Sequence, residues 1–155
     1  MVSCCSVAPV LETSVSRVFN GLTHARVRMH REVGSRDCND GRLLASVGMR
    51  GGVEGVVSIA APVGLCADFA RAQLGAGRYD TDIDALAISA LAEIASVAAG
   101  CVATSLEPVE TTWLTPPAVS GSSSHEWDVM RVGRHTTVLD VDGREVLVSA
   151  DVTER

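Results

Sequence analysis

The feature that most constrains the fold is the segment from Asp82 to Leu106, which is alanine-rich and almost uniformly apolar. It carries one carboxylate near its middle, Glu93. An ionised carboxylate is rarely fully buried without a partner charge, because desolvation of the charge is costly. We therefore expect a helix of about six turns over this segment, with Glu93 facing water or another molecule.

The polar residues of this segment are spaced so that they share one helical face. They follow at steps of 7, 4, 3, 4 and 4 residues and comprise Asp82, Ser89, Glu93, Ser96, Gly100 and Thr104. A repeat of 3.6 residues aligns such positions in one stripe, on which Glu93 and Ser96 lie one turn apart. The other faces are apolar, so the pattern predicts a core helix packed on a sheet. Thr81 and Asp84 stand at the spacing of a capping box at its start.

A membrane span is the alternative for so apolar a segment, since about 17 to 25 residues suffice. An acidic residue in the middle of a bilayer is expensive, and several hydroxyl groups interrupt the run. The five cysteines, at positions 4, 5, 38, 66 and 101, form no CxxC or CxxH pair, and the amino-terminal residues do not resemble a secretory signal. We expect a cytoplasmic protein with reduced thiols and no membrane association.

Composition limits the classes of function. With 155 residues and 46% hydrophobic content, the chain should form a single domain, 1–155, with its own core. The net charge is −6, and all 13 basic residues are arginine. No basic run predicts nucleic-acid binding. The absence of lysine excludes a phosphate-binding lysine, a Schiff base and a Ser–Lys dyad.

The rest of the chain alternates short apolar patterns with turn residues. The pattern predicts helices over 11–22 and 62–75 and strand-like runs over 26–30, 42–50, 53–60, 111–114, 126–132, 135–141 and 144–152. In the last run, apolar residues alternate with polar ones, so one sheet face is dry and the other at least partly wet. The expected fold class is α+β, a mainly antiparallel sheet of about six strands with helices packed on it.

Most motifs for catalysis or cofactor binding are incomplete. The glycines between Gly48 and Gly55 lie in a predicted hairpin and precede no helix, unlike a nucleotide-binding fingerprint. The run Ser122–Ser124 precedes His125 without a GxSxG elbow. The four histidines have no ligand spacing. We therefore expect neither a metal site nor a cofactor of the protein's own.

The long helix and the loop after it resemble a known family. The run from Asp84 to Gly100, followed by Thr115-Pro-Pro-Ala-Val-Ser-Gly121, is similar to the E-x-x-N-x-x-x-G helix and the P-x-V-x-G segment of the CheX group of CheC/CheX/FliY chemotaxis phosphatases. The similarity covers roughly residues 40–121, including the hairpin around Gly51. Ser96 occupies the place of the motif asparagine.

This resemblance implies a CheC-like fold and a function. Such proteins remove the aspartyl phosphate from a receiver domain of the CheY type. The motif glutamate pairs with a lysine of the receiver, and the motif asparagine orients the attacking water, while Mg²⁺ is held by the receiver. Carried over by position, the candidate catalytic residues are Glu93 and Ser96. Homodimerisation through sheet edges is also compatible with the exposed strands.

The departure at Ser96 leaves two functions open. Asn has two donors and one acceptor on a longer arm, whereas Ser has a shorter reach and one donor. A displacement of about 1 Å in such a site costs on the order of 10²-fold in rate. One hypothesis is a weak phosphatase of a phosphorylated receiver. The other is a binding or dimerisation module of the same fold that acts in two-component signalling without hydrolysis.

Overall fold

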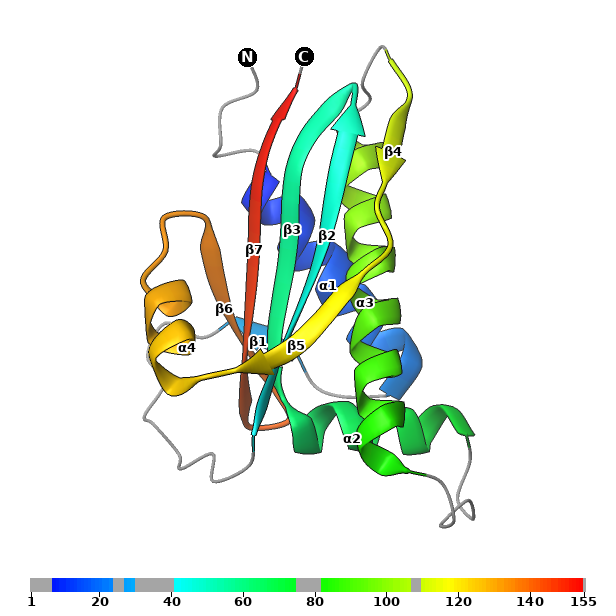
Figure 1. The fold of residues 1–155 in the computed structure, drawn as a ribbon, viewed down its shortest axis with the longest axis vertical. Helices are drawn as coiled ribbons and strands as arrows, with labels where there is room; N and C mark the ends of the chain where they lie inside the picture. Colours follow the sequence, from blue (N-terminus) through cyan, green and yellow to red (C-terminus); the bar gives the residue numbers. More distant parts are fainter. Residues whose placement is uncertain (1–6, 24–26, 30–40, 75–81, 107–109, 155) are drawn as a thin grey trace.

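The computed structural model of the 155-residue chain describes residues 7–23, 27–29, 41–74, 82–106 and 110–154 (Figure 1). Helices and strands follow in the order α1 (Val7–Thr23), β1 (Val27–Met29), β2 (Arg42–Gly51), β3 (Val53–Pro62), α2 (Val63–Leu74), α3 (Ile83–Ser105), β4 (Thr112–Leu114), β5 (Ala118–Ser122), α4 (Ser124–Arg131), β6 (Thr136–Val141) and β7 (Arg144–Glu154). This order confirms the α+β class.

The strands form one antiparallel sheet. Its order is β1-β6-β7-β3-β2-β4, and β5 also pairs with β2. β4 pairs with the end of β2 at Met49–Gly51, and β5 pairs with its beginning at residues 42–46. Because β4 and β5 share one edge of β2, the seven strands found among the described residues occupy six positions across the sheet. The expectation of about six strands is confirmed in this sense.

Helices α1, α2 and α3 cover one face of the sheet and form the main core with it. The alternate residues of β7 that the sequence assigns to the dry face are buried there, namely Val146, Val148, Ala150 and Val152. Phe19 of α1 and Phe69 of α2 meet edge to face, with ring centroids 6.1 Å apart. α3 lies against β2 and β3 on this face, next to the strand edge that carries β4 and β5 (Figure 1).

Residues 126–132 are a correction to the sequence-based prediction. We expected a strand, but the chain forms helix α4, which ends at Arg131. Ser123 is its N-cap: its hydroxyl accepts a hydrogen bond from the Glu126 N–H at 3.1 Å, and its own N–H donates to the Glu126 carboxylate at 2.7 Å. This capping box starts a helix and outweighs the short alternating pattern that follows.

α4 covers part of the second sheet face. Trp127 is buried there with Ala60 and Leu147, whose neighbours in β3 and β7 point into the main core. The Trp127 Nε1–H donates to a Glu145 carboxylate oxygen at 3.2 Å, and Arg131 Nε donates to the same oxygen at 2.8 Å. The second face is therefore partly dry, although the sequence pattern identified only the first core.

Helix α3 begins and ends within one residue of the predicted segment. Asp82 is its N-cap and accepts a hydrogen bond from the Asp84 N–H at 3.1 Å, so the predicted cap at Thr81 is displaced by one residue. By length and hydropathy, α3 meets the criterion for a membrane span, and 44% of the tested window is buried inside the structure. Buried core helices meet the same criterion. The buried side of α3 packs into the main core through Ala87, Ala90, Leu91, Ile94, Ala95, Ala98, Ala99 and Val102.

Candidate functional site

The side of α3 that faces away from the sheet carries the predicted polar stripe. Ser89, Glu93 and Thr104 are exposed, while Ser96 and Gly100 are half-buried. Residues directly adjacent in sequence, such as Ile94, are fully buried. The helical period therefore separates the two faces as the sequence predicts. We call this side of α3, with Ser89, Glu93, Ser96, Val97 and Gly100, the α3 ridge.

Glu93 offers an unpaired carboxylate on this ridge. Within the described part of the chain, it makes no hydrogen bond or ion pair. α3 contains no arginine and the chain contains no lysine, so no cation of the same helix can reach Glu93. An exposed carboxylate without an internal partner can bind a cationic group of another molecule with little rearrangement.

Ser96 offers a hydroxyl group one turn further along. Two other helical hydroxyls bond back to the carbonyl four residues earlier: Ser14 to Val10 at 2.7 Å and Thr104 to Gly100 at 2.9 Å. Ser96 makes no hydrogen bond to any residue that the structure describes. Its donor and its acceptor lone pairs are therefore available to water or to a partner.

The segment that follows α3 is fixed beside it by contacts with β2. The Thr115 N–H donates to the Gly48 carbonyl at 2.9 Å, and the Gly48 N–H donates to the Thr115 hydroxyl at 2.8 Å. A Cβ at Gly48 would lie 3.1 Å from the Thr115 methyl group, so glycine permits this close approach. The crossing connects β4 to β5 along one sheet edge and keeps both strands beside α3 (Figure 1).

Leu114 of β4 extends the exposed face of α3. Leu114 pairs with Met49, whose side chain is buried on the helix-covered face of the sheet, so Leu114 lies on that face too. The preceding residue, Trp113, pairs with Arg50 and lies on the other face. Leu114 Cδ1 lies 4.0 Å from the position that a Cβ on Gly100 would take. Leu114 and Val97 are 41% and 42% exposed, so apolar surface borders the polar residues of the α3 ridge. The sequence did not predict this contact, which depends on how β4 pairs with β2.

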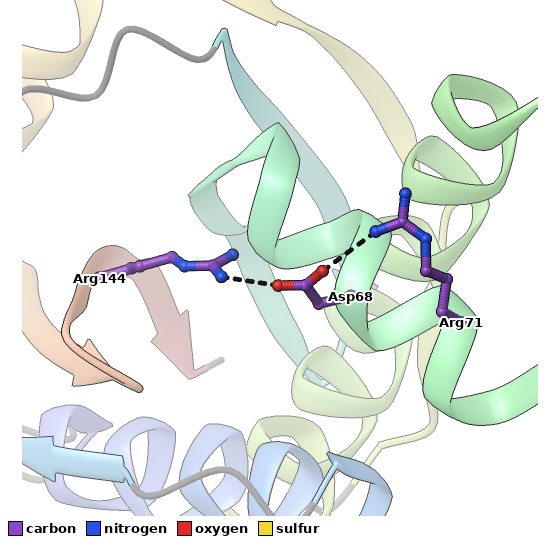
Figure 2. Close-up of polar contacts among 3 residues, drawn as sticks. All are labelled: Asp68, Arg71 and Arg144. Atoms are coloured by element: carbon purple, nitrogen blue, oxygen red, sulfur yellow. Dashed lines mark hydrogen bonds and ion pairs between the residues drawn. The ribbon is translucent and has the colours of Figure 1, made fainter. Parts of the chain in front are cut away.

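A second polar cluster joins the middle of α2 to the beginning of β7. Figure 2 shows Asp68 between two guanidinium groups, with Arg71 at 3.2 Å and Arg144 at 2.6 Å. The cluster lines an open depression of about 810 Å³. Each arginine is already paired with the same carboxylate, and all three side chains are substantially exposed. We assign the cluster to the attachment of α2 to the β6–β7 hairpin, a contact of modest energy.

The remaining candidate groups have structural roles. Burial raises the pKa of the Cys66 thiol to about 12, which excludes it as a nucleophile near neutral pH. In the run before His125, Ser123 is the N-cap of α4, and its hydroxyl accepts a hydrogen bond from the Glu126 N–H. No group of three or more His, Cys, Asp or Glu residues within the described ranges could hold a metal ion.

Solved structures with the same fold come from chemotaxis proteins. The CheX–CheY–BeF₃–Mg²⁺ complex from Borrelia burgdorferi matches with a TM-score of 0.68 at 18% identity, covering 99% of this chain and 100% of that one. CheX from Vibrio vulnificus matches with a TM-score of 0.71 at 14% identity and the same coverage. FliY from Thermotoga maritima matches with a TM-score of 0.59 at 17% identity, covering 94% of this chain and 85% of that one. The fold is therefore that of the CheC/CheX/FliY chemotaxis phosphatases.

The sequence defines the group more closely. The family described as chemotaxis phosphatase CheX matches residues 43–138, from β2 to β6 and through the whole of α3. No curated protein matches the chain. Because the match spans more than half of its length, the chain belongs to the CheX family, as the motif around Glu93 predicted.

Proposed function

We propose that this protein docks a phosphorylated CheY-type receiver domain on the α3 ridge and hydrolyses its aspartyl phosphate slowly. The observation that carries the proposal is the pairing of two groups without internal hydrogen bonds, the carboxylate of Glu93 and the hydroxyl of Ser96, one helical turn apart. The solved structure from Borrelia burgdorferi, which has the same fold, contains CheX in complex with CheY, BeF₃ and Mg²⁺. Such a partner would also place the protein in the cytoplasm.

In this proposal each group has a separate role. Glu93 forms an ion pair with a cationic side chain of the receiver and thereby fixes its orientation. The hydroxyl of Ser96 holds a water molecule in line with the phosphorus atom. Attack by this water forms a new P–O bond and breaks the bond to the aspartyl oxygen, so that inorganic phosphate and a free aspartate carboxylate result. Mg²⁺ held by the receiver balances the charge on the phosphoryl oxygens.

The rigidity of α3 supports this division of roles. Buried neighbours such as Ile94 and Ala95 fix the rotation of the helix about its axis. The two functional groups are therefore held at one turn's separation before a partner arrives, and catalysis by positioning depends on such preorganisation. The short arm of Ser96 is the reason that we expect slow hydrolysis.

Loss of radiolabelled phosphate from the receiver domains encoded in the same genome tests the proposal. We expect the wild type to accelerate phosphate loss for one receiver and Glu93→Ala to abolish this effect. Ser96→Asn should increase the rate by about 10- to 100-fold, because the amide reaches further. Ser105→Ala, at the end of the same helix, is the matched control. Absence of acceleration by both the wild type and Ser96→Asn would refute the phosphatase proposal.

The alternative is a module that binds the receiver without hydrolysis, which the hydroxyl in place of an amide at Ser96 favours. It predicts that the wild type binds a receiver loaded with BeF₃⁻ and Mg²⁺, while the lifetime of the aspartyl phosphate is unchanged. Glu93→Arg should then abolish binding through charge repulsion. Sedimentation of the free protein over a range of concentrations tests the proposed homodimer separately.

A further inference from the structure

Gly100 is a glycine in the interior of a helix, where this residue type is unfavourable. It lies in the interior of α3, five residues before the end of the helix. Glycine destabilises a helix interior relative to alanine, because it loses more backbone entropy on folding. Glycine would be required by the fold if a larger side chain caused a steric conflict, as at Gly48, where a Cβ would approach Thr115 to 3.1 Å.

No such conflict exists at Gly100. The nearest described heavy atom outside the local helix backbone would lie 4.0 Å from an added Cβ, which is an ordinary van der Waals distance. The backbone conformation of Gly100 does not require glycine either, because the positive-φ residues lie elsewhere in the described chain. Alanine would therefore fit within the fold. The side chain is absent on the exposed side of α3, where it leaves room for another molecule.

The neighbours of Gly100 define what fits into this room. Glu93, Ser96, Val97 and Gly100 lie at i, i+3, i+4 and i+7, the four positions that surround one side chain of a partner when helices interlock. Val97 and Leu114 are each more than 40% exposed beside Gly100. Glu93 lies at the opposite corner, about 10 Å along the helix axis. The arrangement therefore combines exposed apolar side chains on either side of a glycine with one negative charge.

We infer that Gly100 sets the distance of approach between α3 and the docked receiver, and that an apolar side chain of the receiver packs over Gly100 between Val97 and Leu114. This inference rests on the proposed docking function. The receiver surface that fits carries an apolar side chain within about 10 Å of the cationic group that pairs with Glu93. Close approach at Gly100 also brings Ser96, one turn earlier, near the phosphoryl group.

Binding of the full chain to the receiver loaded with BeF₃⁻ and Mg²⁺ tests this inference. Gly100→Ala should weaken binding about tenfold, and Gly100→Leu should weaken it further, because each fills the space that the partner side chain occupies. Both variants should melt no lower than the wild type, and Gly100→Ala should melt about 2 °C higher, since alanine favours the helix. A residue with a purely structural role would not show stability and affinity changing in opposite directions.

Ser105→Leu is the control for added bulk, because Ser105 is exposed on another side of α3. It should bind the receiver like the wild type. Unchanged binding by Gly100→Ala and Gly100→Leu would overturn the inference and leave the proposed function intact. Equal weakening by Ser105→Leu and Gly100→Leu would also overturn it. A wild type that binds no receiver of the same genome would overturn both.

Discussion

The orientation of α3 can be tested with two isoleucines of the same helix. Ile94 is completely buried, whereas Ile88 is 43% exposed. Ile94→Ala removes buried methyl and methylene groups and leaves a cavity, which costs about 2–5 kcal/mol of unfolding free energy. Ile88→Ala leaves no closed cavity, because the space vacated by the side chain is open to solvent. If the three carbon groups lost in Ile88→Ala were completely buried, their removal would cost roughly 2.4 kcal/mol of unfolding free energy. Only just over half of the Ile88 side chain is buried, and the better helix propensity of alanine returns a few tenths of a kcal/mol. The expected loss for Ile88→Ala is therefore about 1 kcal/mol.

Urea unfolding followed by circular dichroism measures both variants against the wild type. Total stability is about 5–15 kcal/mol for proteins of this kind, so Ile94→Ala removes a substantial fraction of it. With a slope of about 2 kcal/mol per molar urea, the two midpoints should differ by roughly 0.5–2 M. Equal losses for Ile88→Ala and Ile94→Ala would refute the assignment of the buried face, and with it the exposure of Glu93.

Two further predictions concern α4 and the sheet. Hydrogen bonds from Ser123, the backbone N–H first and the hydroxyl second, hold the pKa of Glu126 below its usual value of 4.5. The charged carboxylate therefore stabilises the fold at pH values above 4.5, and this stabilisation is lost as the pH falls through the lowered pKa. The stability difference between the wild type and Glu126→Gln should consequently shrink on acidification. Urea titrations at several pH values measure this difference. Gly55→Ala should lose more than about 3 kcal/mol in the same assay, because φ is 144° and a Cβ would lie 2.0 Å from the Asp151 carbonyl oxygen. Gly121→Ala, with no heavy atom within 4 Å of the added Cβ, is its control; similar losses for the two would contradict the steric argument.

The long helix and its exposed face could be predicted from the sequence because both depend on local periodicity. Polar residues at helical spacing identified the α3 ridge, and Glu93 drew attention to it because a lone carboxylate is costly to bury. The cap shifted from Thr81 to Asp82 because neighbouring polar residues compete for the same role. Such boundaries depend on the backbone conformation of a single residue.

The features that sequence reasoning missed have two causes, contacts between distant segments and a local capping signal. The exposed face gains Leu114 through the register of β4 on β2, which no local pattern specifies. Residues 126–132 contain apolar residues at spacings that suit a strand or a helix, and the deciding signal was the capping box formed by Ser123 and Glu126. Trp127 then buries itself on a sheet face that the pattern of β7 marks as partly polar.

The small second core makes α4 a unit that can open independently of the rest of the protein. Its buried apolar contacts are few, with Trp127 packed on Ala60 and Leu147, and none of these residues belongs to the main core. Amide protons of α4 should therefore exchange with solvent through local opening, whereas those at the centre of α3 should exchange only when the whole protein unfolds. Detachment of α4 would leave Glu93 and Ser96 in place on a folded helix.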